Sequence, residues 1–351
     1  MNNPDDEIAQ VLDDVLGGWG PATHADLDTS IAVWNALLEL GFPYVSLNED
    51  LGGAGGTVED AFAVLRTLGA HGSGAPLAES GFLAGWLLTT AGLNLEPALR
   101  ALVPPLGGEL TFDGSIVSGR ARGVAWVQEA DTVVALVDGQ GGQFVVELGT
   151  KDVLVANTMQ TVAGEPRSDL RVDAVTPVRV ATAGTNRGEY LRRAAATRVA
   201  LIAGALERAR DLTVTYTNER IQFGQAVAKF QAVQVHLARL AEDAALVGAA
   251  SELLAASAEE GIFPSFEVAS ATLLARSSAR EAAKAAHQAH GAMGVTREYP
   301  LHVITRHLWQ WSHEFASSSI WQQTVLDAVR DAGADDYYPL ITGGSNWRRQ
   351  P

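Results

Sequence analysis

Long alanine-rich segments with helical periodicity fill most of the second half of the sequence. Apolar residues recur at every third or fourth position in these segments, so each helix has an apolar face to bury against another element. Four long helices that follow one another along a chain pack as a bundle. The sequence therefore predicts a C-terminal helical bundle over 186–351, with helices at 190–218, 233–259 and 266–290 and a last helix that begins near Ser319.

Two regions of different character precede the predicted bundle. Residues 1–107 are predicted to form an N-terminal helical domain, because the helical spacing of apolar residues continues to about residue 102. Residues 108–185 are predicted to form a shortened middle β domain, because short Val- and Leu-rich runs alternate with turn residues. The expected fold class is therefore mainly α with a small β domain. The predicted helices here are 31–40 and 58–68, and the predicted strands are 116–117, 132–137 and 143–148, with a hairpin turn at 138–142.

Composition excludes several classes of protein. The chain has 351 residues and no cysteine, which excludes disulfides, thiolate catalysis and cysteine-ligated metal centres. Its formal net charge of −16 argues against a broad nucleic-acid or anionic-membrane surface, so a phosphate-bearing ligand must be met by local arginines. The sequence contains no run of about 18 apolar residues, and it starts with acidic residues where a secretory signal would be basic. We therefore expect a soluble, cytoplasmic protein.

Three other patterns invite functional interpretations that we do not adopt. The glycine-rich segment 51–56 lacks the Gly-Lys-Ser/Thr ending of a phosphate-binding loop, and we interpret it as an ordinary loop. The sequence has neither the Gly-x-Ser-x-Gly motif of a hydrolase nor a strand followed by the Gly-x-Gly-x-x-Gly motif of a dinucleotide-binding domain. Histidines three residues apart, without a carboxylate or cysteine in the array, favour helix-surface residues over a metal site. These histidines are His287, His290, His302, His307 and His313.

The strongest functional signal is a set of three short motifs inside the predicted bundle. They are Arg-Ile-Gln-Phe-Gly at 220–224, Phe-Gln at 230–231 and Gln-Ala-His-Gly-Ala-Met-Gly at 288–294. A guanidinium can bind a pyrophosphate through two hydrogen bonds, and glycines let the backbone approach a ligand closely. Taken alone, Arg220 is also consistent with a helix cap and Gln288 with a solvent-facing position. The combined spacing favours half of a nucleotide-binding site.

These motifs, together with the helical, β and bundle regions, resemble the acyl-CoA dehydrogenase family along nearly the whole chain. Further support comes from Asp113-Gly114 at the entry to the β domain and from the segment 294–300. The resemblance implies that the protein binds FAD, and that one protomer contributes this half of the site to a flavin ring seated in its neighbour. It implies that Arg220 contacts the FAD pyrophosphate. The other residues that it assigns to FAD binding are Phe223, Gly224, Gln231, Gln288, Gly291, Ala292, Ser317 and Ser318.

Enzymes of this family desaturate an acyl-CoA thioester to a 2-enoyl-CoA. A carboxylate removes the α proton while the β hydrogen leaves as hydride to flavin N5, and an acceptor such as an electron-transfer flavoprotein then takes the electrons. The resemblance implies that the base lies on the segment 312–318, where Glu314 is the candidate catalytic residue. A count from Arg306 without a gap puts Phe315 at the base position and Glu314 one residue before it. The family's alternative base position falls on Ala194, which cannot abstract a proton.

The predicted β domain departs from the family pattern. No Thr-Glu-Pro-x-x-Gly-Ser-Asp segment precedes Asp113, and 102–108 leads almost directly into 111–113. In the family that segment contacts the flavin ring and the thioester, so the resemblance implies half a site. We therefore predict a subunit of an α2β2 complex in which a fuller homologue supplies the flavin pocket and the base, as in bacterial steroid side-chain degradation. The acyl substrate, steroid or fatty acyl, stays open. Two alternatives are a non-catalytic structural partner subunit and a flavin-dependent monooxygenase on the same fold.

Overall fold

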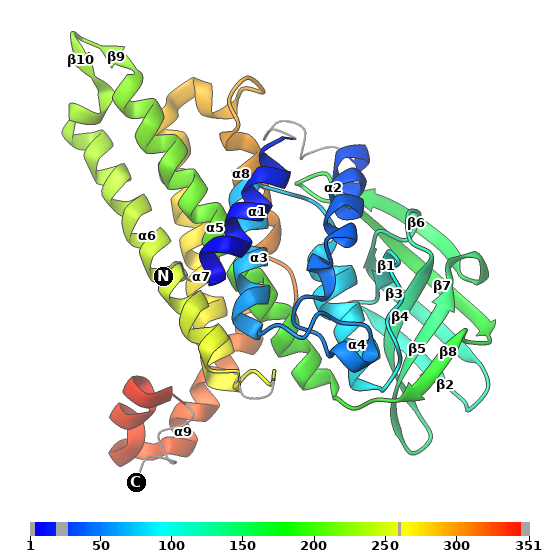
Figure 1. Ribbon diagram of the computed structural model, residues 1–351. Coiled ribbons are helices and arrows are strands. Elements are labelled where there is room, and N and C mark those ends of the chain that lie inside the picture. The colour runs from blue at the N-terminus through cyan, green and yellow to red at the C-terminus, as the bar shows by residue number, and fades with distance from the viewer. Residues whose placement is uncertain (1–3, 19–26, 259–260, 345–351) are drawn as a thin grey trace. The chain divides into compact units, whose positions relative to one another are not determined.

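The computed structural model describes residues 4–18, 27–258 and 261–344, and Figure 1 shows the course of the chain. The acidic start of the sequence lies in part outside these residues. Helices dominate both ends of the described chain, and a β-sheet lies between them in sequence. The predicted fold class, mainly α with a small β domain, is confirmed. Within the described ranges, none of the helices is long and apolar enough to cross a membrane.

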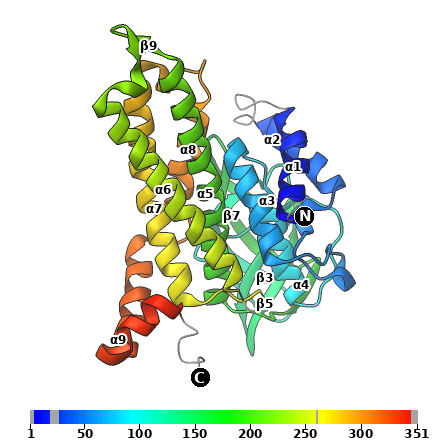
Figure 2. The ribbon, with the colours of Figure 1, turned by 60° about the vertical axis from the view of Figure 1, so that its left-hand side comes forward.

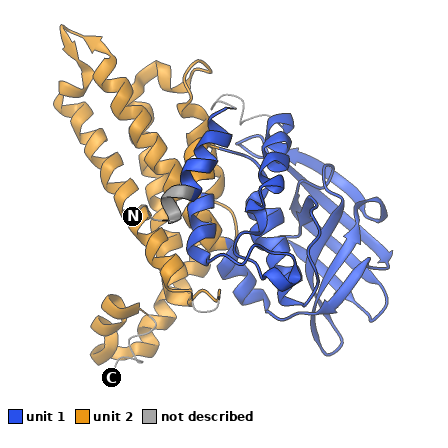
Figure 3. Ribbon diagram, in the orientation of Figure 1, with its two compact units in different colours: residues 1–65, 73–194 blue, residues 66–72, 195–351 orange. Residues whose placement is uncertain are grey.

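The chain folds as two compact units, which are coloured separately in Figure 3. Unit 1 contains Met1–Leu65 and Ser73–Ala194, and unit 2 contains Arg66–Gly72 and Ala195–Pro351. The division into three domains stays a prediction.

The first part of the chain is helical. Its elements are α1 (Pro4–Gly17), α2 (Leu27–Glu39), α3 (Val58–His71), a π-helical segment (Leu77–Gly85) and α4 (Trp86–Thr90). One face of α2 is buried and carries Val33, Trp34 and Leu37. These residues share a face because positions three and four residues apart lie on the same side of a helix. The two helices predicted in this region are confirmed. The glycine-rich segment 51–56 forms a loop before α3, as predicted.

An eight-stranded sheet follows α4 in sequence. Its strands are β1 (Arg100–Leu102), β2 (Gly108–Phe112), β3 (Val117–Ala125), β4 (Thr132–Gly139), β5 (Gly142–Gly149), β6 (Leu154–Gln160), β7 (Pro166–Val175) and β8 (Arg179–Thr182). The strand order is β6-β7-β3-β1-β4-β5-β8, and β2 pairs with both β3 and β4. Strands β4 and β5 pair antiparallel in one continuous register that ends at Gly139 and Gly142. The predicted hairpin is therefore confirmed.

The structure corrects the sequence-based boundary between the helical and β regions. Helical character was expected to continue to about residue 102, but Arg100, Ala101 and Leu102 form β1, which pairs parallel with β4. A strand of three buried residues is too short to show a periodicity in the sequence. Its strand conformation depends on pairing with the neighbouring strand. The sheet also contains β2, β6, β7 and β8, which the sequence did not predict. All seven residues of β6 are exposed, so this strand lacks the alternation of buried and exposed residues that reveals a strand in a sequence.

Unit 2 contains the predicted bundle. Its helices are α5 (Arg187–Glu219, from Ala195 onward), α6 (Gln231–Ala256), α7 (Ser265–His290), α8 (Leu301–Trp311) and α9 (Ser318–Gly343), and a hairpin of β9 (Ile221–Gln222) and β10 (Gln225–Ala226) joins α5 to α6. Figures 1 and 2 show α5, α6 and α7 running side by side. Several alanines of α7 are buried, among them Ala279, Ala282 and Ala286. Because their side chains are short, neighbouring helices can approach α7 closely. The four predicted helices are confirmed, and α8 is an additional one.

Candidate functional site

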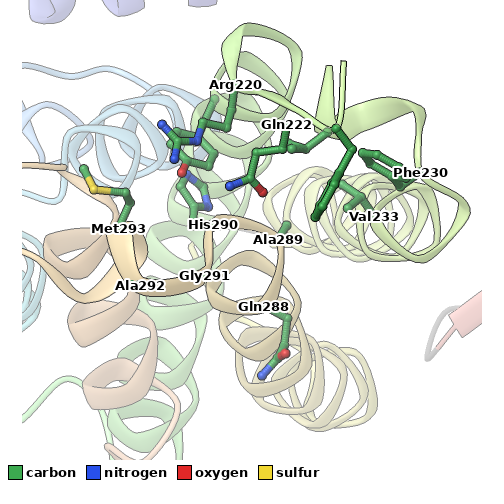
Figure 4. Close-up of a pocket in the computed structure, with 13 residues that line it drawn as sticks. Arg220, Gln222, Phe230, Val233, Gln288, Ala289, His290, Gly291, Ala292 and Met293 are labelled. Atoms are coloured by element: carbon green, nitrogen blue, oxygen red, sulfur yellow. The ribbon is translucent and has the colours of Figure 1, made fainter. Parts of the chain in front are cut away.

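A cavity of about 410 Å³ lies where the end of α5, the β9–β10 hairpin, the start of α6 and the end of α7 meet (Figure 4). Its wall combines a guanidinium, two amide side chains, aromatic rings and a turn that contains glycine. The lining residues are Tyr216, Arg220, Gln222, Phe223, Val227, Phe230, Val233, Gln288, Ala289, His290, Gly291, Ala292 and Met293. The structure thus brings together five residues that the resemblance assigned to FAD binding: Arg220, Phe223, Gln288, Gly291 and Ala292.

The β9–β10 hairpin places Arg220 and Phe223 at this cavity. Its two-residue loop consists of Phe223 and Gly224, which have φ angles of 51° and 81°. Two successive residues with positive φ form the tight turn that suits a short antiparallel hairpin, and glycine is favoured in such a turn. The backbone N–H of Val227 donates to the carbonyl oxygen of Arg220 over 2.9 Å and closes the base of the hairpin.

Arg220 and Phe223 are accessible to a ligand. The guanidinium of Arg220 is exposed and has no hydrogen-bond or ion-pair partner among the described residues. The side chain of Phe223 is 92% exposed, and its ring meets that of Phe230 edge to face with centroids 6.1 Å apart. A cavity that contains both a cation without a counter-charge and aromatic faces is suited to a pyrophosphate that carries an aromatic base.

The end of α7 forms the opposite wall of the cavity. Gly291 has φ 61° and ψ −140°, a backbone conformation that is nearly restricted to glycine, and its N–H donates to the carbonyl oxygen of His287. This turn ends α7 and leads the chain along the cavity through Ala292 and Met293. Gln288 also lines the cavity, and its side chain extends away from Arg220 (Figure 4).

His290 is a buried cavity residue, whereas the sequence predicted a position on a helix surface. Its ring stacks on the ring of Tyr216 with centroids 4.5 Å apart. The ring of Tyr299 lies tilted against it, with centroids 4.9 Å apart. Burial lowers the pKa of His290, against the opposing effect of a hydrogen bond with Ala286 and with a smaller contribution from His287. Nδ1 lies 2.9 Å from the carbonyl oxygen of Ala286, which can only accept, so the neutral ring carries its proton on Nδ1. His290 thus holds Tyr216 in place beneath the cavity.

Some lining residues lie outside the three motifs, and the sequence analysis did not name them. Tyr216 lies four residues before Arg220, so helical spacing puts it one turn below the guanidinium on the same face of α5. That spacing would have identified Tyr216. Val227 and Val233 look like core residues, and only the folded chain shows that they border a cavity.

Four residues of the predicted site do not line this cavity. Gly224 and Gln231 are adjacent in sequence to residues that do line it. Ser317 and Ser318 lie elsewhere in unit 2, at the start of α9, beside a different cavity. Their roles in FAD binding stay predictions, as does the catalytic role of Glu314.

Glu314 is held by two side chains of unit 2. Arg198 Nε donates to its Oε2 over 2.6 Å, and Gln310 Nε2 donates to its Oε1 over 3.2 Å. The Arg198 side chain is 5% exposed and the Glu314 side chain 18% exposed, so this is a largely buried ion pair. The guanidinium of Arg198 also lies over the ring of Phe315, 4.8 Å from its centroid. Arg198 and Glu314 also line a void with a volume of about 10 Å³, near the size of one water molecule.

The backbone after Glu314 has an uncommon conformation. Phe315 and Ala316 have φ angles of 53° and 81°, in the left-handed region that non-glycine residues rarely adopt. Arg276 on α7 stabilises this segment because its guanidinium donates to the carbonyl oxygens of Glu314 (2.5 Å) and Ala316 (2.9 Å). The side chain of Glu314 is thereby fixed both by its ion pair and by its own backbone.

The five histidines considered for a metal site form hydrogen bonds with neighbouring protein groups. His287 Nε2 lies 2.9 Å from the hydroxyl of Thr305, and His302 Nδ1 lies 2.9 Å from the carbonyl oxygen of Tyr299. In the part of the chain that the structure describes, no three His, Asp or Glu side chains are grouped so that they could hold a metal ion.

Comparisons with known proteins agree with the fold and with the motifs. The model of the acyl-CoA dehydrogenase C-terminal domain matches residues 188–309. The chain is 30% identical to acyl-CoA dehydrogenase IpdE2 of Mycobacterium tuberculosis over 292 residues, which cover 80% of this chain and 81% of that protein.

Two solved structures share the fold. A chain of the ChsE4-ChsE5 complex from Mycobacterium tuberculosis has a TM-score of 0.80 and 19% identity, and the match covers 95% of this chain and 99% of that one. A variant of the Tcur3481-Tcur3483 steroid ACAD has a TM-score of 0.81 and 21% identity, with 93% and 98% covered. The sequence identity to IpdE2 extends over most of both chains, so it supports membership of a family and not only a shared fold. This chain belongs to the acyl-CoA dehydrogenase family.

Proposed function

We propose that this chain is a subunit of a FAD-dependent acyl-CoA dehydrogenase, and that it binds the adenosine diphosphate part of a FAD shared with a homologous subunit. The observation that carries the proposal is the cavity at Arg220. Its exposed guanidinium has no partner in the described residues, and the rings of Phe223 and Phe230 line the same cavity. These groups fit a pyrophosphate and an adenine ring.

The separation of the two candidate regions supports a site shared between subunits. Arg198, which holds Glu314, lies on α5, and Arg220 directly follows the last residue of this helix. The 22 residues between them correspond to about 33 Å of helical rise. An extended FAD molecule is shorter than this distance. One chain therefore cannot hold the adenosine end of a FAD at Arg220 and also present its own Glu314 to the flavin ring of the same molecule.

Within the shared site this chain orients the cofactor. When bound, FAD supplies the hydride acceptor for the β hydrogen of the substrate. Arg220 neutralises and positions the pyrophosphate, Phe223 and Phe230 offer aromatic faces to the base, and Gly291 keeps a side chain out of the turn that borders the cavity. Rigid placement of the adenosine end fixes where the rest of the molecule can lie in the neighbouring subunit.

We assign the catalytic base to the homologous subunit. A base must reach the α proton of the thioester through a free carboxylate oxygen. Both oxygens of Glu314 accept hydrogen bonds, and the void beside it is no larger than a water molecule. Glu314 would have to leave Arg198 before it could act, which favours a structural role in this chain.

The similar proteins suggest the partner and the substrate class. One solved structure with this fold is a complex of two different proteins, ChsE4 and ChsE5, and another is a steroid ACAD. We therefore propose an α2β2 assembly with a homologous acyl-CoA dehydrogenase subunit and an acyl-CoA substrate with a steroid or fatty acyl group. The electrons from such a desaturation pass to an acceptor such as an electron-transfer flavoprotein.

The proposal predicts turnover by the complex and none by the chain alone. This chain would be co-expressed with a homologous subunit, and dye reduction would be followed with fatty acyl-CoA and steroid acyl-CoA thioesters. We expect a 2-enoyl-CoA product, identified by mass, from one of these classes. A complex that consumes oxygen in the presence of reduced flavin and forms no enoyl product would instead be a monooxygenase and would contradict the proposal.

A further inference from the structure

His290 has a buried ring nitrogen without a hydrogen-bond partner. The residue is 4% exposed, and it lines the same cavity as Arg220 (Figure 4). Nδ1 donates to the carbonyl oxygen of Ala286, whereas Nε2 is buried and has no hydrogen-bond partner in the described part of the chain. Buried polar atoms are nearly always paired. A ligand in the cavity would supply the partner that Nε2 lacks.

The bond that Nε2 can form depends on the charge of the ring. In the neutral ring Nδ1 carries the proton, so Nε2 can only accept a hydrogen bond. A phosphate oxygen that carries no proton is also an acceptor, so it repels the lone pair of a neutral Nε2. In the protonated ring both nitrogens donate, and Nε2 then forms a charge-assisted hydrogen bond with a phosphate. A pyrophosphate in the cavity therefore favours the protonated form of His290.

The charges at the cavity also favour a proton on His290 when a pyrophosphate is bound. Among the described lining residues, Arg220 is the one arginine or lysine, and there is no carboxylate. Each phosphoryl group of the FAD pyrophosphate carries one negative charge, so one guanidinium neutralises only half of the pyrophosphate. The backbone N–H of Arg220 donates to the carbonyl oxygen of Tyr216, on whose ring His290 stacks, so His290 lies close to Arg220. A proton on His290 would neutralise the other half.

The neighbours of His290 keep its ring neutral when no ligand is bound. Facing the ring are Tyr216 from α5, Tyr299 from the segment before α8 and His287 from α7. Burial lowers the pKa of His290, and His287 adds a smaller lowering against the hydrogen bond with Ala286. Burial also raises the pKa of Tyr299, so this hydroxyl is neutral where histidines titrate. The charged and titratable groups that act on these neighbours are Arg208, Glu219 and His302.

We propose that His290 takes up a proton when a pyrophosphate binds at Arg220, so that this chain holds the adenosine end of FAD more tightly as the pH falls. The inference rests on the proposed function, in which the pyrophosphate is that of FAD. The pH window lies between the lowered pKa of His290 in the ligand-free chain and its higher pKa beside the pyrophosphate. Within this window FAD binding takes up as much as one proton, so the affinity falls up to about tenfold for each unit by which the pH rises.

Proton uptake is measured by calorimetry with FAD, which has no group of its own that titrates in the range of histidine. The flavin-free complex of this chain with a homologous subunit is titrated near neutral pH in two buffers with different heats of protonation. The difference between the observed heats gives the number of protons taken up per FAD. We expect uptake that approaches one proton, and an affinity about 5- to 50-fold higher at about pH 6 than at about pH 8.

Two variants of His290 assign the proton to this residue. His290→Phe keeps a ring that stacks on Tyr216 and cannot take up a proton, and His290→Gln has an amide that donates at any pH. In both complexes we expect the proton uptake and the pH dependence of FAD affinity to be lost. The matched control is His236→Gln, because His236 lies on α6 and does not line the cavity. This control should keep the proton uptake of the original complex.

The proton count and the flavin content separate the inference from the proposed function. FAD binding without proton uptake, or uptake that persists in both His290 variants, would overturn the inference and leave the proposed function in place. Loss of the uptake in His236→Gln would overturn the inference as well. A complex that keeps its flavin after Arg220→Ala would contradict the proposed function, and the inference with it.

Discussion

Replacement of Arg220 by alanine is expected to weaken FAD binding by the complex about 10- to 100-fold, because a hydrogen bond to a charged group contributes about 1.5–3 kcal/mol. The guanidinium has no partner within the described residues, so its loss should leave the fold unchanged. The measurement is the amount of flavin per complex after gel filtration and dialysis. The difference in flavin affinity between the variant and the original complex should be smaller at high salt, because ions screen the exposed Arg220 contact in the original complex.

Two variants serve as controls for Arg220→Ala. Arg220→Lys keeps the charge and loses the paired donors, so it should retain flavin better than alanine and less well than arginine. Arg330→Ala removes an exposed arginine far along α9, and the complex with this variant should retain all of its flavin. Full flavin content in the Arg220→Ala complex would mean that this chain is a structural partner that does not contact FAD.

Replacement of Arg198 by methionine is expected to lower the free energy of unfolding by about 3–5 kcal/mol, because it leaves a largely buried carboxylate without its partner. The pair joins α5 to the segment after α8, with 5% of the Arg198 side chain and 18% of the Glu314 side chain exposed. The measurement is the denaturation midpoint of the purified chain in urea. The double variant Arg198→Met with Glu314→Met should recover most of the loss, since it removes both charges.

Glu314→Gln separates the structural role of this residue from a catalytic one. Glutamine can still accept a hydrogen bond from Arg198, so the stability loss should be smaller than for Arg198→Met. Turnover of the complex should stay within about threefold of the original value, because the base lies in the homologous subunit. Loss of a general base typically costs about 10²- to 10⁴-fold. A loss of that size with flavin retained would identify Glu314 as the base.

The long helices and one hairpin could be predicted from the sequence because their signals are local. The periodicity of α5, α6, α7 and α9 extends over many turns, and the glycine cluster between β4 and β5 marks a tight connection. The strands β1 and β6 have no such local signal. Strand β1 has three residues and depends on its parallel partner β4, and β6 is exposed on every residue and depends on β7.

The candidate site could be predicted only in part, for a related reason. The motifs around Arg220 and Gln288 lie at helix ends that meet in space, and their spacing predicted residues of one cavity. Chain spacing does not show that Tyr216 stacks on His290, because the two are far apart in sequence and meet only through bundle packing. Nor does it show that Ser317 and Ser318 face Arg276 and Arg280 in a different cavity.

The most direct test of a shared FAD site is the visible absorbance spectrum and the mass of this chain, purified alone and then co-purified with a homologous subunit. We expect no flavin bands from the chain alone, and bands from a heteromeric complex that contains fewer FAD molecules than chains. An isolated chain that is yellow, self-associated and active with acyl-CoA would contradict the shared site and would make this chain a complete dehydrogenase.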